Sequence, residues 1–141
     1  MFKNLMTTKA GWGTTVVRVI TGIVFIGHGL PKIGIGSERS IQGLADWLGG
    51  SLGLPLPMLM AVLVVAAEVV GGFAMVIGLF VRPAALTTFI AMIVATTMVH
   101  WDAGMFGDGG YQWSLLLALI SLGLMLDGAG KASLDQRFAA A

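Results

Sequence analysis

The chain has no cysteine and very little charge. Among its 141 residues there are 8 lysines and arginines and 7 aspartates and glutamates, so only 11% are charged and the net charge is +1. The absence of cysteine excludes disulfides, thiolate catalysis, cysteine-ligated zinc, iron–sulfur clusters and covalently attached c-type haem. A net charge so close to zero gives no support for a nucleic-acid partner.

Apolar residues are correspondingly abundant. Hydrophobic side chains make up 57% of the chain, and its mean hydropathy is +0.92. A soluble domain averages about 25% charged residues, more than twice the fraction found here. So little charge cannot cover a surface that faces water. The composition therefore predicts an integral membrane protein in contact with a lipid bilayer, and the length fits a single domain.

Four apolar segments have the length of a membrane-spanning helix, about 20 residues, or come close to it. They must be helices, because an isolated strand would leave its backbone groups unpaired in hydrocarbon. The predicted spans are residues 12–33, 57–79, 83–101 and 112–126. We therefore expect an all-α fold over residues 1–141, a transmembrane four-helix bundle in which adjacent spans are antiparallel.

The first outer loop, residues 32–56, contains an amphipathic segment, SERSIQGLADWLGGSLGLP. Ser37 is the expected N-cap of a short helix, and Gly49-Gly50 is the expected stop. Its apolar residues recur at helical spacing: Ile41, Leu44, Trp47 and Leu48. Such a helix suits the bilayer surface or the mouth of the bundle, and the sequence leaves both positions open.

Basic residues in short loops predict the orientation of a membrane protein, because they concentrate on the cytoplasmic side. With both termini in the cytoplasm, only Lys32 and Arg39 lie outside. Five basic residues then lie inside: Lys3, Lys9, Arg82, Lys131 and Arg137. The count favours cytoplasmic termini.

Apart from Lys32, which is counted with the first outer loop, four ionisable residues fall within the predicted spans: Arg18, His28, Glu68 and His100. A charge at the centre of a bilayer costs at least about 2.5–3.5 kcal/mol, so each needs a structural or functional reason. At a rise of about 1.5 Å per residue, Glu68 lies near the midplane and both histidines lie in the outer half of the membrane. These residues are therefore candidates for a common interior site.

Glu68 interrupts the apolar run LVVAAEVVGGFAMV. Its structural interpretation is a packing carboxyl group that fixes helix register, either protonated or paired with Arg18. Its functional interpretation is a proton donor or acceptor, or a ligand anchor, inside the bundle. We predict catalytic roles for Glu68 and His28, and we favour Arg18 as the partner of Glu68.

The predicted ligand-binding residues share helix faces with the ionisable groups. Gly71 and Gly72 follow Glu68 on its face, where they allow close helix approach or leave room for a ligand. Thr97 shares a face with His100. The full predicted ligand-binding set is Arg18, His100, Gly71, Gly72 and Thr97. The simpler alternatives are interfacial histidines and an arginine that reaches the cytoplasmic interface.

No metal or haem site is predicted. The two histidines and the glutamate are far apart in the sequence, with no local motif such as HExxH. The nine methionines are scattered along the chain and are interpreted as packing residues.

Three longer stretches resemble the DoxX-like family of small four-helix membrane proteins. They are RVITGIVFIGHGLPKIG, AEVVGGFAMVIGLFVRPAAL and GGYQWSLLLALISLGLMLDGAGKASLD, and the resemblance runs from about Thr14 to Asp135. Gln112 departs from it, because the family often has glutamate after Gly–Gly–Tyr. The residues that match the family pattern are Arg18, Gly27, Lys32, Glu68, Gly71, Gly72, Gly78, Arg82, Ser133, Leu134 and Asp135.

The resemblance implies a redox-associated protein of the bacterial inner membrane. Members of the family are linked to quinone-coupled oxidation and to the detoxification of quinones, catechols or nitroaromatics. We therefore expect this chain to bind a quinone or small aromatic molecule and to act as, or within, a quinone-coupled oxidoreductase. Electrons would come from a bound cofactor, the substrate or a soluble redox partner. The alternatives are a non-catalytic anchor or assembly subunit for a redox enzyme, and a small-molecule carrier that works as a homo-oligomer.

Overall fold

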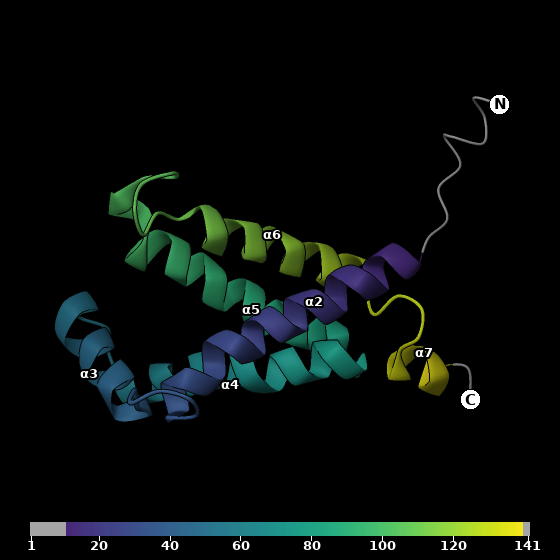
Figure 1. Cartoon of the computed structure of the whole chain (residues 1–141), viewed down its shortest axis with the longest axis horizontal. Coiled ribbons are helices and arrows are strands. Elements are labelled where there is room, and N and C mark those ends of the chain that lie inside the picture. Colours follow the sequence, from purple (N-terminus) through teal and green to yellow (C-terminus); the bar gives the residue numbers. More distant parts are fainter. Residues whose placement is uncertain (1–10, 140–141) are drawn as a thin grey trace.

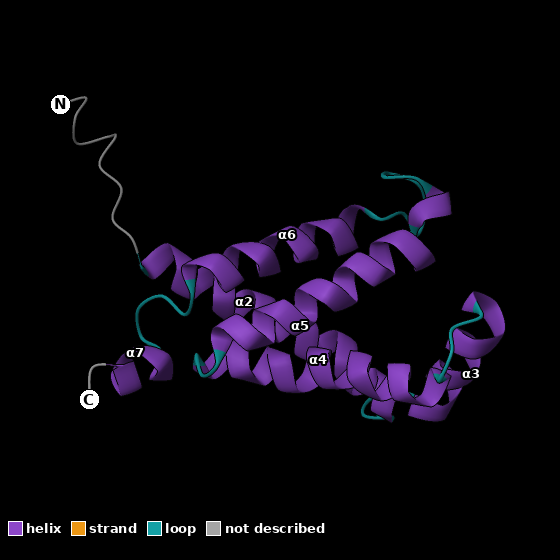
Figure 2. Ribbon diagram, turned by 180° about the vertical axis from the view of Figure 1, so that it is seen from behind, coloured by secondary structure: helices purple, strands orange, loops and turns teal. Residues whose placement is uncertain are grey.

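The computed structural model describes residues 11–139, and this part of the chain is helical with no strand (Figures 1 and 2). Four long helices run back and forth: α2 (Trp12–Gly29), α4 (Pro57–Ile77), α5 (Val81–Val94) and α6 (Gln112–Asp127). The predicted four-helix architecture is confirmed. Lys3 and Lys9, which contributed to the predicted orientation, lie outside the described residues.

Short elements extend and connect these helices. A 3-10 turn, Leu30–Ile33, continues α2, and a π-helical turn, Ala95–Val99, continues α5. With these extensions, three helices are long and apolar enough to cross a membrane: Trp12–Ile33, Pro57–Ile77 and Val81–Val99. The fourth, α6, is apolar but shorter. The remaining elements are α3 (Ile41–Leu52), the 3-10 turn Trp101–Ala103 and α7 (Leu134–Ala139).

The long helices pack as two pairs. Helix α2 lies along α4, α5 lies along α6, and α4 joins the pairs through α5. Helix α6 also contacts α2, and it ends close to the start of α2. In Figure 1, α2 and α6 are near each other at the end where α7 lies and separate toward the end where α3 lies. We call these the terminal end and the loop end of the bundle.

Glycines let α2 and α4 approach closely. A Cβ atom added at Gly22 would lie 2.6 Å from the carbonyl oxygen of Gly72, and one added at Gly72 would lie 2.8 Å from that of Gly22. The two backbones are therefore in direct contact, as in other membrane helix pairs that cross at small residues. Gly29, two turns further along α2, brings α2 against Glu68 in the same way.

Hydroxyl pairs join α5 to α6. Thr88 donates a hydrogen bond to the Oγ of Ser121 at 3.1 Å, and Thr96 donates to the Oγ of Ser114 at 2.9 Å. All four side chains are buried. Hydrogen bonds of this kind hold membrane helices together, because hydrocarbon offers the hydroxyl groups no other partner.

Helix α3 begins and ends later than predicted. Its N-cap is Ser40, whose Oγ accepts a hydrogen bond from the Gly43 N–H, and it ends at Gly53 with φ +62°. Ser37 lies before the helix, where its hydroxyl group donates to the Pro31 carbonyl at 2.7 Å and accepts from the Arg39 N–H at 3.2 Å. Gly49-Gly50 does not stop the helix. The buried Ala45 and Leu48 pack on Ala61 of α4, so α3 sits against the mouth of the bundle.

Candidate functional site

A cavity of about 670 Å³ lies between α2, α5 and α6 toward the loop end of the bundle. Its volume is within the range of about 300–1,000 Å³ that is common for small-molecule sites. Most of its wall is apolar: Ile20, Val24, Phe25, Met92, Ala95, Trp113, Leu116, Leu117 and Ile120. Four ionisable side chains also line it: His28, Lys32, Glu68 and His100. The cavity is therefore an apolar chamber with a small set of polar groups.

Glu68 is paired with Lys32. The Lys32 Nζ lies 2.5 and 2.6 Å from the two carboxylate oxygens of Glu68, whose side chain is only 3% exposed. Glu68 faces α2 from the middle of α4, and the 3-10 turn after α2 carries Lys32 back toward it. The ammonium group neutralises the carboxylate, which makes its burial among apolar residues tolerable.

The predicted pairing of Arg18 with Glu68 is wrong. Arg18 is 1% exposed and donates hydrogen bonds to the carbonyl oxygens of Met75, Val76 and Ala132. Met75 and Val76 are in the last turn of α4, where carbonyl groups lack helical partners and attract a cation. Arg18 therefore lies at the terminal end of the bundle and is not among the residues that line the α2–α5–α6 cavity.

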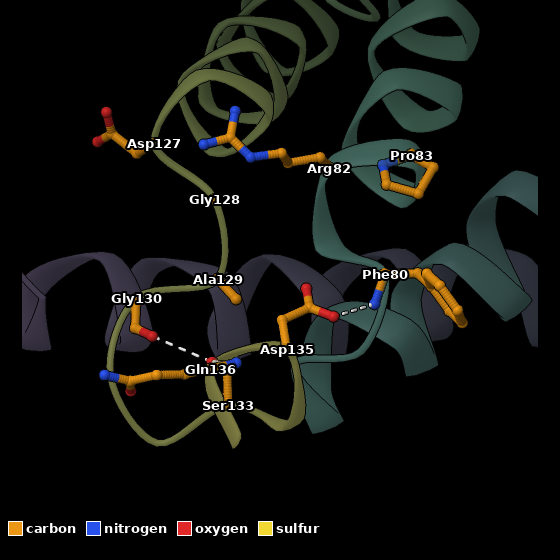
Figure 3. Close-up of a pocket in the computed structure, with 10 residues that line it drawn as sticks. All are labelled: Phe80, Arg82, Pro83, Asp127, Gly128, Ala129, Gly130, Ser133, Asp135 and Gln136. Atoms are coloured by element: carbon orange, nitrogen blue, oxygen red, sulfur yellow. Dashed lines mark hydrogen bonds between the residues drawn. The ribbon is translucent and has the colours of Figure 1, made fainter. Parts of the chain in front are cut away.

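The segment after α6 is hydrogen-bonded to the terminal end of the bundle. The carboxylate of Asp135 accepts a hydrogen bond from the Phe80 N–H at 2.7 Å (Figure 3). It also accepts one from the Val81 N–H at 3.0 Å and so caps the start of α5. The Asp135 N–H donates to the Gly78 carbonyl at 2.9 Å. A second cavity of about 420 Å³ lies beside this segment, between Arg82 and Asp127 on one side and Ser133 on the other. Gly78 and Asp135, which match the family pattern, thus hold the terminal end together.

Both histidines line the α2–α5–α6 cavity. His28 lies in the last turn of α2, one helical turn before Lys32. His100 follows the π-helical turn of α5, and its Nδ1 lies 2.7 Å from the carbonyl oxygen of Gly109. A π-helical turn adds one residue to the usual hydrogen-bonded ring, and such turns are frequent at functional sites.

The remaining predicted ligand-binding residues lie elsewhere. Gly71 faces α5, where an added Cβ atom would lie 3.3 Å from a methyl carbon of Thr88, and Gly72 packs against α2. Thr97 is exposed and donates to the Ile93 carbonyl at 2.9 Å. The cavity-lining residues do not include these three. The structure therefore brings together Glu68, His28 and His100, but neither the glycines nor Thr97.

Lys32 lines the cavity but is absent from the predicted site, because it was interpreted as a basic residue of the outer loop although it also matches the family pattern. Its spacing was informative: Lys32 follows His28 by four residues, which places both on one face of a continuing helix. Within residues 11–139 no three histidine, aspartate or glutamate side chains are grouped closely enough to hold a metal ion. The chemistry open to these side chains is hydrogen bonding and proton transfer.

Comparisons with known proteins identify the family. The DoxX family model matches residues 13–101. The chain is 38% identical over 112 residues to a Bacillus subtilis protein named "Putative oxidoreductase CatD". This match covers 79% of this chain and 78% of that protein. It is 33% identical over 131 residues to the Escherichia coli "Inner membrane protein YphA", covering 86% and 87% of the two chains. No solved structure matches. By its family match and these relatives, the chain belongs to the DoxX family of membrane proteins.

Proposed function

We propose that this protein binds a quinone or a related small aromatic molecule in the α2–α5–α6 cavity and acts as, or within, a quinone-coupled oxidoreductase. One observation carries the proposal: a largely apolar cavity includes a buried carboxylate–ammonium pair and two imidazoles in its wall. The name of the Bacillus subtilis relative, which calls it an oxidoreductase, also supports it.

The chemistry of a quinone matches this wall. A quinone has an apolar ring and tail, which suit the aliphatic and aromatic lining, and two carbonyl oxygens that accept hydrogen bonds. Lys32 can donate to one of these oxygens, because an ammonium group has three N–H donors and Glu68 occupies two. Reduction to the hydroquinone takes two electrons and two protons. Glu68 and His28 can transfer the protons, and the electrons come from a reducing substrate or from the redox centre of a soluble partner protein.

The mouth of the cavity favours a lipid-soluble ligand. Ile20, Trp113 and Leu116 line the cavity and are 57%, 68% and 48% exposed. They lie on α2 and α6, the two helices that separate toward the loop end. In a bilayer these apolar side chains face the lipid tails, so a ligand enters sideways from the membrane and avoids crossing the polar loops.

The proposed location is the bacterial inner membrane, with both termini in the cytoplasm. The name of the Escherichia coli relative supports the location, and the excess of basic residues at the terminal end supports the orientation. The loop end, with Lys32 and the histidines, then faces the outside of the cell. Protons exchanged at the cavity would be taken from, or released to, that side.

Ligand extraction tests the function. The protein, purified from its native membrane in a mild detergent, should carry quinone that is detected by mass spectrometry of a solvent extract. Glu68→Gln should lose most of it, because the variant breaks the ion pair at the polar part of the cavity. Asp46→Asn is the matched control, since Asp46 is exposed on α3, accepts a hydrogen bond from Gln42 and does not line the cavity.

Two other results would contradict the proposal. A ligand-free protein that co-purifies with a soluble redox enzyme would indicate the anchor role. Substrate uptake into sealed vesicles, without bound quinone, would indicate a carrier.

A further inference from the structure

The loop between α5 and α6 holds one carbonyl group in front of His100. Backbone hydrogen bonds close the loop, from Tyr111 to Gly104 at 3.1 Å and from Gln112 to Met105 at 3.2 Å. The rings of Trp101 and Tyr111 stack across its base with their centroids 5.2 Å apart. Gly109 is within this closed loop, and its carbonyl oxygen lies 2.7 Å from His100 Nδ1. The loop therefore fixes the imidazole as well as connecting two helices.

This contact determines which ring nitrogen carries the hydrogen. A carbonyl oxygen can only accept a hydrogen bond, so at 2.7 Å Nδ1 must be the donor. In a neutral imidazole the other nitrogen, Nε2, then has a lone pair and no hydrogen. Because His100 lines the α2–α5–α6 cavity and its Nδ1 is held by the loop, Nε2 is the ring atom left for a ligand, and it is an acceptor.

The carboxylate in the cavity adds more acceptor capacity. A carboxylate has about four lone-pair sites, and Lys32 uses two of those on Glu68. A quinone carbonyl group cannot donate to Glu68 or to His100 Nε2. A hydroxyl group can donate to either of them and can also accept from Lys32.

We propose that the cavity selects the hydroxyl form of its ligand, a hydroquinone or another phenol, and that His100 is the specificity-determining residue. This inference rests on the proposed function and names the ligand class for the same cavity. A bound quinone would leave the His100 lone pair facing a carbonyl oxygen, with no donor for that acceptor in an apolar chamber. A site that binds the reduced form more tightly favours reactions in which the quinone is the electron acceptor.

The expected selectivity is about tenfold, the ratio that corresponds to one acceptor left unpaired beneath the bound ligand. A pair of ligands that do not undergo redox cycling measures it: 4-decylphenol and its methyl ether, titrated by calorimetry into the full-length protein in lipid nanodiscs. The phenol should bind about tenfold more tightly than the ether. Decylubiquinol and decylubiquinone, titrated without oxygen, should show the same order.

His100→Asn isolates the role of the acceptor. An asparagine amide reaches the position of Nδ1 and keeps the bond to the Gly109 carbonyl, but it has no atom at the position of Nε2. Its phenol-to-ether ratio should fall close to one. Met98→Leu is the matched control, because Met98 is exposed just before His100 and does not line the cavity, and its ratio should stay at the wild-type value.

A spectroscopic measurement tests the imidazole independently of binding. The chain has only two histidines, so His28→Asn leaves His100 as the single imidazole. Its ¹⁵N chemical shifts should report hydrogen on Nδ1, and hydrogen on Nε2 alone would overturn the inference. Equal wild-type binding of phenol and ether, or an unchanged preference in His100→Asn, would also overturn it and leave the proposed function intact. A wild-type protein that binds neither the phenol nor decylubiquinone would overturn both.

Discussion

Lys32 and Glu68 join the turn after α2 to the middle of α4 through two contacts of 2.5 and 2.6 Å. The pair is neutral as a unit, so an apolar cavity holds charged groups without holding net charge. Neither group is stable there alone, because an isolated ion in a low-dielectric interior keeps its desolvation penalty and loses its partner.

Lys32→Met should therefore destabilise the protein by roughly 3 kcal/mol, the lower end of the range for breaking a buried pair, because Lys32 is partly exposed. The double variant Lys32→Met/Glu68→Leu should recover most of this loss, because an apolar pair of similar volume suits the surroundings. Unfolding in mixed micelles with increasing sodium dodecyl sulfate measures both. A double variant no more stable than Lys32→Met would show that the pair is not the source of the loss.

The contact between Gly22 and Gly72 predicts that alanine substitutions at two glycines of α2 change stability by different amounts. Gly22→Ala should destabilise by about 1–3 kcal/mol, because the new methyl group would meet a backbone carbonyl 2.6 Å away, which cannot move aside as a side chain can. Gly27→Ala, on the same helix, meets nothing within 4 Å and should be neutral or slightly stabilising through helix propensity. The same micelle unfolding assay compares them. Equal effects at the two positions would contradict the close crossing of α2 and α4.

Arg18 is predicted to hold the terminal end of the bundle and to have no part in ligand binding. Arg18→Met should cost about 2 kcal/mol, because buried carbonyl oxygens of Met75 and Ala132 lose their donor. It should also free the segment after α6 for proteolysis near Lys131. The amount of quinone bound per folded protein molecule should equal that of the wild type. If the Arg18→Met variant is intact and folded but carries no ligand, this prediction is wrong. Arg18 would then have the ligand-binding role that the sequence suggested.

The absence of cysteine makes the orientation directly testable. Ser51→Cys places a single thiol at the exposed end of α3, and Gln136→Cys places one on exposed α7. In intact spheroplasts a membrane-impermeant maleimide should label the first variant only, and it should label both after permeabilisation. The reverse pattern would place the termini outside and contradict the proposed orientation.

Hydropathy was sufficient to predict the fold. The four long apolar runs became α2, α4, α5 and α6, because backbone groups in hydrocarbon have no other way to be satisfied. The ends of the elements were harder to predict. Ser37 and Ser40 are both good N-cap residues. The Ser37 hydroxyl group bonds to the Pro31 carbonyl and the Arg39 N–H, and the helix starts only after Ser40. Such contacts leave no periodic signal in the sequence.

The candidate site was predicted only in part, because contacts between elements leave no periodic signal in the sequence. An acidic residue within an apolar run identifies Glu68, and the depth of each span places both histidines toward one end of the bundle. The partner of Glu68 is set by the 3-10 turn at Leu30–Ile33, which returns Lys32 to the bundle, whereas Pro31 marks this point in the sequence as the end of a helix. Arg18 looked like the nearer cation, but the last-turn carbonyl groups of α4 hold it.

The spacing of the ion pair has a consequence for biogenesis. Its two members are 36 residues apart in the chain, so Lys32 leaves the ribosome well before Glu68. At a synthesis rate of about 5–20 residues per second, Lys32 is made roughly 2–7 s before Glu68. During that interval it can stay hydrated at the membrane surface, since it lies at the very end of the first apolar span, Trp12–Ile33. Glu68 then enters the bilayer with a counter-ion already in place, which makes the first helix and its turn an assembly guide for the second.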